Sequence, residues 1–109
     1  GLKPDYDSGW FAVSATAVNT YTLTHNLGVF PTRVMAYTAS SASPSWVRMI
    51  NFISAGVAYT SPEAFWMSTT EAKITLCCND YVIYCDANNP CPTGEVSSTS
   101  GYMKVLMWK

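Results

Sequence analysis

The side chains best suited to chemistry are few: four cysteines, a single histidine and seven carboxylates. A Ser–His–acid or Cys–His arrangement would have to use His25, which ends an alternating segment just before the turn at residues 26–28. A histidine in that position is typically hydrogen-bonded to the backbone or to a neighbouring segment. The carboxylates lie mostly beside turns or near the chain ends, where solvated acids are common. We therefore predict that the protein is not an enzyme and that it uses no cofactor.

The four cysteines, Cys77, Cys78, Cys85 and Cys91, leave two alternatives open. A structural metal site would need paired Cys-x2–4-Cys knuckles, which the chain lacks, so no metal is expected. Cys77 and Cys78 point to opposite faces of a strand, whereas Cys85 and Cys91 could form a disulfide at the base of a long polar loop. The other alternative is that all four are free thiols of a protein kept in a reducing compartment.

The elements that position these residues have a period of two rather than 3.6, because larger side chains alternate with hydroxyls. In residues 32–39, for example, Val34, Ala36 and Thr38 share one face, and Arg33, Met35 and Tyr37 share the other. No stretch of about 12 residues has helical spacing with caps, and only a helical turn at residues 62–64 is expected. The pattern predicts an all-β fold with strands at residues 9–13, 20–25, 32–39, 46–53, 57–60, 65–68, 73–78, 81–85 and 102–109.

The clearest local unit is a predicted hairpin that joins residues 73–78 to residues 81–85 through Asn79-Asp80. Asn and Asp both tolerate the positive φ that such a two-residue turn requires. In that register one face, predicted to be the core face, carries Ile74, Leu76, Cys78 and Ile83. The more exposed face carries Thr75, Cys77, Val82 and Tyr84.

Composition restricts the possible partners. The 109 residues fit a single domain over residues 1–109, with an entry segment at 1–8 and a long polar loop at 86–100. Only 12% of the residues are charged and the net charge is −1, so no basic surface for nucleic acid is expected. No apolar run approaches the roughly 18–20 residues that cross a bilayer, so membrane insertion is not expected either. Polarity comes instead from 12 Ser and 12 Thr.

Several runs of the sequence together resemble a known family. They are Asp7-Ser8-Gly9-Trp10-Phe11-Ala12-Val13, Tyr21-Thr22-Leu23-Thr24-His25-Asn26-Leu27-Gly28, Pro31-Thr32-Arg33-Val34 and Gly101-Tyr102-Met103-Lys104-Val105-Leu106-Met107-Trp108. Their order and spacing resemble H-type lectin-like domains, and more closely the copies at the C-terminal ends of bacteriophage tail-fibre proteins. The resemblance covers roughly the first 40 and the last 40 residues, and residues 40–70 do not contribute to it.

The resemblance implies an antiparallel β-sandwich of about six strands that assembles as a homotrimer, binds a glycan at one end and is located on the virion, facing outward. The animal members bind sugar through an Arg, a Trp-His pair and a loop Asp. Lys73 falls near the position of the Arg, and Asn19 falls near the position of the Asp. Residues 87–89 fall near the position of the Trp-His pair, but this sequence has neither a Trp nor a His there. The amino-sugar specificity of those members therefore does not carry over.

If that architecture holds, a tentative sugar site lies at one end of the sandwich and contains Asn19, Lys73, Asp86, Asn88 and Asn89. A sugar ring also needs an aromatic face. Tyr84 and Tyr102 bracket the long loop, and Trp46 and Trp66 are further candidates. The competing interpretation is that the tyrosines pack strands and the Asn and Asp residues form turns. His25, Arg33, Met35 and Tyr37 are candidates for contacts about a threefold axis.

The sequence thus predicts a lectin-like, receptor-binding tip module of a phage tail fibre that attaches to a glycan of the host-cell surface. The alternative is a structural trimerisation domain of a fibre tip that binds no sugar itself. An enzyme acting on polysaccharide is the weakest of the three interpretations, because it rests only on carboxylates whose spacing in space the sequence does not report.

Overall fold

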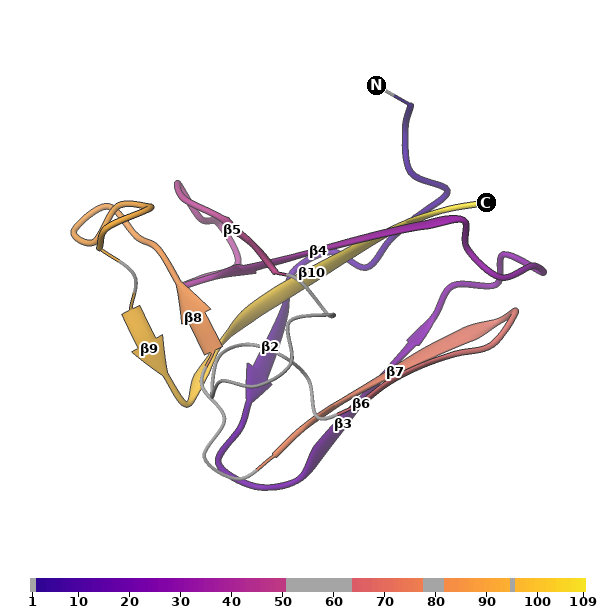
Figure 1. The fold of residues 1–109 in the computed structure, drawn as a ribbon, viewed down its shortest axis with the longest axis horizontal. Helices are drawn as coiled ribbons and strands as arrows, with labels where there is room; N and C mark the ends of the chain where they lie inside the picture. Colours follow the sequence, from indigo (N-terminus) through magenta and orange to yellow (C-terminus); the bar gives the residue numbers. More distant parts are fainter. Residues whose placement is uncertain (1, 51–63, 78–81, 95) are drawn as a thin grey trace.

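The computed structural model describes residues 2–50, 64–77, 82–94 and 96–109 (Figure 1). These residues form ten strand segments and no helix, and every pairing between strands is antiparallel. The all-β prediction is therefore confirmed. The segments are β1 (Tyr6–Asp7), β2 (Phe11–Ser14), β3 (Asn19–Thr24), β4 (Arg33–Ala39), β5 (Arg48–Ile50), β6 (Ala64–Met67), β7 (Glu71–Leu76), β8 (Val82–Tyr84), β9 (Val96–Ser98) and β10 (Ser100–Trp108).

The largest sheet has five strands and is organised around β10, which pairs with β4 along one edge and with both β1 and β2 along the other. β5 extends the sheet beyond β4. The chain passes from β1 to β2 through Gly9, whose φ of +67° favours glycine. At this break the Ser8 hydroxyl accepts a hydrogen bond from the Val105 amide of β10 (2.8 Å). β1 and β2 therefore pair with the same edge of β10 as two separate short strands.

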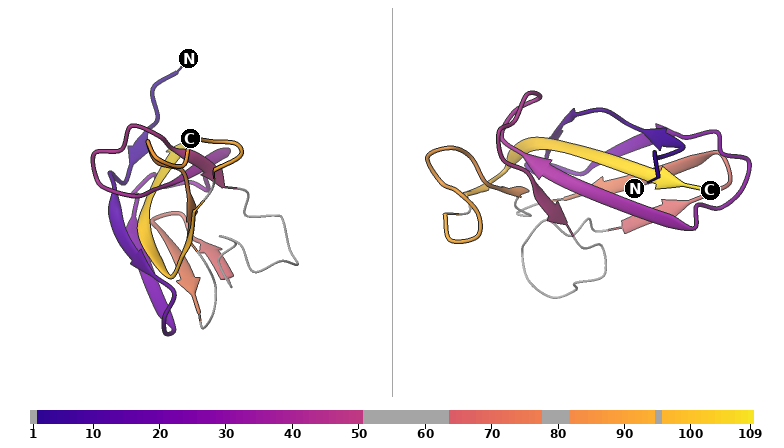
Figure 2. Two further views of the ribbon diagram at one scale, coloured as in Figure 1. Left: turned by 90° about the vertical axis from the view of Figure 1, so that its left-hand side faces the viewer. Right: turned by 90° about the horizontal axis from the view of Figure 1, so that it is seen from above.

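The second layer is a three-stranded sheet with β7 between β3 and β6. Figure 1 shows β4 and β10 in one layer and β3, β6 and β7 in the other, and in the right-hand view of Figure 2, seen from above, the first layer lies in front of the second. The core lies between them, because alternate residues of each strand face inward. Its most buried members include Val13, Leu23, Ala36, Ile74, Leu76, Met103, Val105 and Met107.

The outward positions of the two sheets also follow the predicted alternation. Thr20, Thr22 and Thr24 of β3 are exposed, as the hydroxyl pattern predicts. In β4, Ala36 and Thr38 are buried, whereas Arg33 is exposed and the other two residues of that face are half-buried. A period of two therefore assigned the faces of these strands correctly.

The predicted hairpin between residues 73–78 and 81–85 is wrong. β7 is occupied on one edge by β3 and on the other by β6, so it has no free edge for β8. β8 pairs instead with β9, in the register Val82↔Ser98 and Tyr84↔Val96. The connection at residues 78–81 lies outside the described residues.

The prediction of which residues of that hairpin face the core is correct for residues 74 and 76 and wrong for residue 82. Ile74 and Leu76 are buried, as predicted, but Val82 is buried too, with 1% of its surface exposed. Val82 is buried because β8 lies against β10 and β4 rather than against β7. The side chains of Cys78 and Ile83 lie outside the description.

Other expected elements differ in length or lie outside the described residues. The apolar segment at 46–53 contributes only the three residues of β5, Arg48–Ile50, within the described part of the chain. The strand expected at 57–60 and the helical turn expected at 62–64 lie outside the described residues, apart from Ala64, which begins β6. Ten segments replace the six strands implied by the resemblance, partly because Gly9 and Thr99 each separate two neighbouring segments.

Gly101 of β10 is the position where β8 meets the five-stranded sheet. A Cβ atom on Gly101 would lie 2.8 Å from Cγ1 of Val82 and 3.3 Å from Cδ2 of Tyr84. The first distance is too short for two carbon atoms, so a Cβ at this position would force the Val82 side chain or the strand to shift.

We predict that Gly101→Ala lowers the free energy of unfolding by about 1–3 kcal/mol, the usual cost of overpacking. Urea denaturation measures this, with Ser100→Ala at an exposed neighbouring position as the control. An alanine in a strand normally stabilises slightly relative to glycine. Equal or higher stability of Gly101→Ala would therefore contradict the packing of β8 on β10.

Candidate functional site

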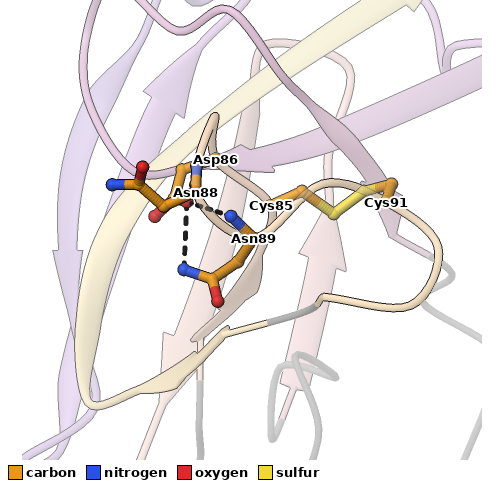
Figure 3. The surroundings of a disulfide bond; sticks show 5 residues. All are labelled: Cys85, Asp86, Asn88, Asn89 and Cys91. Carbon is orange, nitrogen blue, oxygen red and sulfur yellow. Dashed lines mark hydrogen bonds between the residues drawn. A yellow bond between two sulfur atoms is a disulfide. The ribbon is translucent and has the colours of Figure 1, made fainter.

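Three residues of the predicted sugar site and both cysteines of the predicted disulfide lie together in the loop that follows β8. Cys85 and Cys91 form a disulfide, and Asp86, Asn88 and Asn89 lie within the ring that it closes (Figure 3). Cys77 is disulfide-bonded as well. The free-thiol alternative is therefore wrong for these three cysteines, and the Cys85–Cys91 alternative is the one that the structure contains.

The polar groups of this loop mostly serve each other. Oδ1 of Asp86 accepts hydrogen bonds from the Asn88 amide (3.0 Å), the Asn89 amide (2.8 Å) and the Asn89 side chain (3.1 Å). Figure 3 shows the two bonds from Asn89 as dashed lines. Backbone hydrogen bonds between Asp86 and Asn89 run in both directions. This is the turn-forming interpretation of Asp and Asn, in which Oδ1 of the carboxylate serves the loop itself.

Asn19 and Lys73 do not join that group. Asn19 opens β3 opposite Leu76 on the inward face, where its side-chain amide donates to the carbonyl oxygens of Ser14 (3.0 Å) and Ala17 (3.3 Å). Lys73 lies opposite Thr22 on the outward face of the same sheet. The two residues are thus on opposite faces, and Figure 1 shows their sheet well apart from the loop beyond β8.

The two tyrosines that were expected to bracket the loop also separate. Tyr84 lies against Gly101 and packs on the core, while Tyr102 is the next residue of β10 and faces the other side of the strand. Tyr84 therefore packs strands, as the competing interpretation held. The predicted set is split among the disulfide loop, the inner edge of β3 and two strand faces.

His25 is held by backbone groups on both ring nitrogens. Nδ1 accepts a hydrogen bond from the Leu27 amide (3.1 Å), so Nε2 carries the proton and donates to the Ser68 carbonyl oxygen (3.0 Å). Only 5% of the residue is exposed. The structural role predicted for His25 is confirmed, and its candidacy for a surface contact about a threefold axis is wrong because the ring is buried.

The same corner packs Tyr6 of β1 edge-on against His25, with ring centroids 6.3 Å apart. Burial, and then the negative charge of Asp7, raises the pKa of Tyr6 above its usual value of 10.0. The Tyr6 hydroxyl therefore remains neutral around pH 7. In the described residues no three His, Cys, Asp or Glu side chains converge as metal ligands would.

The most site-like surface is a groove of about 260 Å³ on the outward side of β6 and β7. Trp66 of β6 lies directly opposite Lys73 of β7, which in turn lies opposite Thr22 of β3. The Trp66 side chain is notable because 55% of it is exposed. Glu71, two residues along β7 from Lys73, completes the polar wall, and the groove is lined by Trp66, Met67, Ser68, Glu71 and Lys73.

The floor of this groove is fixed by the β6–β7 turn. The Ser68 hydroxyl accepts hydrogen bonds from the amides of Glu71 (2.9 Å) and Thr70 (3.2 Å). The segment after β3 holds the turn from outside, because the amides of His25 and Asn26 donate to the Thr70 carbonyl oxygen (2.9 and 3.0 Å). The groove is therefore preorganised by the backbone.

Sequence reasoning included Lys73 and mentioned Trp66, but it did not place them together or include Glu71. The signal was present in the short polar connection Ser68-Thr69-Thr70, which joins two alternating segments. That connection marks a hairpin in which Trp66 and Lys73 face each other. This hairpin was missed because residues 73–78 were predicted to pair with residues 81–85 instead.

The outward face of the five-stranded sheet is chemically different. A second groove of about 320 Å³ there is lined by Trp10, Tyr37, Val47, Lys104 and Leu106. Val47 and Met49 beside it are 45% and 58% exposed. Lys104 is paired with Asp7 (3.6 Å) and lies 5.8 Å from the Trp10 ring centre, so the surface around this groove is mainly apolar with one neutralised charge.

No protein-family model matches the chain, and no curated protein has a significantly similar sequence. The described residues also contain no helix that is long and apolar enough to cross a membrane.

The hydrogen bonds of Asp86 predict a specific role for that side chain. We expect Asp86→Ala to accelerate hydrogen exchange of the Asn88 and Asn89 amides by at least about tenfold, because a hydrogen bond to a charged acceptor contributes about 1.5–3 kcal/mol. Asp86→Asn keeps an acceptor oxygen and serves as the matched control. Unchanged exchange in Asp86→Ala would mean that the Cys85–Cys91 disulfide alone orders the loop.

Proposed function

We propose that the protein is a carbohydrate-binding module, of the lectin-like kind found at phage tail-fibre tips, that attaches to a glycan of the host-cell surface. The observation that carries the proposal is the exposed Trp66 beside Lys73 and Glu71 on the outward face of the three-stranded sheet. The site proposed here is thus the groove of Trp66, in place of the loop end predicted from the sequence.

The groove offers the groups that a neutral sugar ring needs. An exposed indole provides a flat apolar surface for the C–H side of the ring. The Lys73 ammonium donates hydrogen bonds and the Glu71 carboxylate accepts them, so sugar hydroxyls of either orientation find a partner. No described carboxylate lies within ion-pair distance of Lys73, so its ammonium can interact with a ligand.

The hydroxyl-rich strand β3 extends the polar surface beside this groove. Thr22 lies next to Lys73, and the hydroxyls of Thr20 and Thr75 are hydrogen-bonded to each other at 2.9 Å. These hydroxyls make the outer surface of the sheet polar but uncharged. An uncharged saccharide can therefore contact this part of the surface without removing water from ionised groups. The low charge of the chain supports the same partner class.

We also propose that the chain forms a homotrimer through the outward face of the five-stranded sheet. Tyr37, Val47, Met49 and Leu106 give that face apolar groups that a monomer would leave in water. The opposite sheet carries threonines, Lys73 and Glu71, which suit solvent and ligands. Assembly through the apolar face would leave the groove of Trp66 accessible in every copy.

The apolar face also supports the second candidate, a fibre-tip domain that only trimerises. This candidate shares the trimer with the first and differs only in sugar binding. The sequence resemblance to tail-fibre domains supports the virion setting of both.

We predict that Trp66→Ala weakens binding of host-surface glycans about thirtyfold or more, because truncating a central Trp typically costs about 2 kcal/mol or more. A glycan array identifies the ligand, and calorimetry on the purified domain measures Kd. Trp46→Ala, which truncates another exposed Trp away from this sheet, is the control. A trimeric wild-type protein that binds no array glycan would support the purely structural alternative.

For the trimer, we predict that Met49→Lys shifts the protein from three times the 11.9 kDa chain mass to a monomer. The added ammonium would be buried without a partner at the interface, which is costly. Light scattering after gel filtration measures the mass, and Thr22→Lys on the exposed face of the other sheet is the matched control. If Met49→Lys remained a trimer and Thr22→Lys became a monomer, the contact between copies would lie on the three-stranded sheet and the proposal would be wrong.

A further inference from the structure

A separate pocket lies where the first residues of the chain meet the start of β4 and the end of β10. Figure 1 shows both chain ends at this end of the five-stranded sheet. The pocket has a volume of about 540 Å³ and is lined mainly by Lys3, Asp5, Thr32, Arg33, Trp108 and Lys109. Along β4, Arg33 lies four residues before Tyr37, so the pocket is distinct from the apolar groove.

The pocket concentrates positive charge in a chain that has little of it. Lys3, Arg33 and Lys109 are three of its six basic residues, although the whole chain has a net charge of −1. Of the described residues, none places a carboxylate within ion-pair distance of these three side chains. The lining holds one side-chain carboxylate, Asp5, whose Oδ2 accepts a hydrogen bond from the Lys109 amide (2.7 Å). The Thr32 hydroxyl donates to the main-chain oxygen of Lys109 (2.8 Å).

The Arg33 guanidinium makes two weak contacts, and among the described residues no oxygen acceptor takes its N–H groups. It lies over the Trp108 ring, 4.9 Å from the ring centre, on the adjacent strand. The ring is fixed in turn, because its indole N–H donates to the Leu2 carbonyl oxygen (3.1 Å). Nη2 of Arg33 contacts only the sulfur of Met35 (3.3 Å), a weak acceptor.

A guanidinium held in this way is suited to an oxyanion. Its planar set of N–H donors matches the two oxygens of a carboxylate or a phosphate, and preorganisation lowers the entropy lost on binding. Lys3 and Lys109 add attraction at longer range. The indole edge and the Thr32 side chain supply a wall for the remainder of a ligand.

We infer that this pocket binds the anionic group, carboxylate or phosphate, of an acidic saccharide. The inference rests on the proposed function in taking a saccharide as the ligand, but it uses a different site and different residues. The groove of Trp66 then binds neutral rings and the pocket of Arg33 binds acidic ones. A surface polysaccharide that carries both would be held at two points on one chain.

The test is a titration of the ¹⁵N-labelled protein followed by NMR at the Trp108 Nε1–H and Arg33 Nε–H signals. The probes are glucuronic acid, glucose 6-phosphate, inorganic phosphate and neutral glucose. We expect both signals to shift with the acidic sugars at millimolar concentration and not with glucose. A response to glucuronic acid assigns carboxylate, a response to glucose 6-phosphate above that to inorganic phosphate assigns a sugar phosphate, and equal shifts with glucose overturn the inference.

Variants decide which residues are responsible. Arg33→Gln should weaken binding of the acidic sugar at least about tenfold, given the strength of charge-assisted hydrogen bonds. Lys3→Gln, at an exposed position that no fold contact requires, should weaken it less but measurably. Lys104→Gln removes a cation from the same sheet outside the pocket and should leave Kd unchanged, and an equal loss in Lys104→Gln and Arg33→Gln would refute the pocket.

The two proposals fail separately. If Trp66→Ala abolishes acidic-sugar binding and Arg33→Gln does not, the pocket is refuted and the groove of Trp66 is the acidic-sugar site. If neutral glycans do not bind anywhere but Arg33→Gln removes the response to acidic sugars, the groove is refuted and the pocket stands.

Discussion

The double pairing of β10 is the constraint on which the rest of the structure depends. Its nine residues form ladders with β4 on one edge and with β1 and β2 on the other, so four of the five strands of this sheet are held together through β10. Met103, Val105 and Met107 are fully buried on its inner side. Because side chains alternate, Lys104, Leu106 and Trp108 must then face outward.

This single strand thereby defines the chemistry of two surfaces. Leu106 and Lys104 lie in the apolar groove beside Tyr37, and Trp108 supplies the ring beneath Arg33. The other sheet faces solvent with threonines, Lys73 and Trp66. The apolar groove and the pocket of Arg33 thus lie at different positions along one face of the five-stranded sheet, whereas the groove of Trp66 lies on the other sheet. A module that assembles through the apolar groove can therefore keep the groove of Trp66 open to a sugar.

Much of the fold could be predicted from alternation alone, because it reports which side of a strand is buried. The faces of residues 20–24 and 33–38 are as the pattern predicts. The hairpin at residues 73–85 is wrong for a physical reason: strong β propensity in two neighbouring segments does not reveal whether their edges are already occupied. In the folded chain β3 and β6 occupy the two edges of β7, which leaves no edge for β8.

The candidate site shows the same limit. Asp86, Asn88 and Asn89 are indeed neighbours, but Oδ1 of the Asp86 carboxylate is hydrogen-bonded within its own loop, which residue type alone does not disclose. His25 was predicted correctly as structural, because a strand end next to a turn offers backbone partners that both ring nitrogens use.

The sequence by itself determined the all-β character, the inward and outward faces of its long strands and the low charge of its surface. These properties are local: each depends on residue types and a spacing of two. Only the tertiary structure decided that Trp66 lies beside Lys73, that Arg33 lies over Trp108 and that β8 pairs with β9. These properties are set by which strand edges meet, and that depends on the packing of the whole chain.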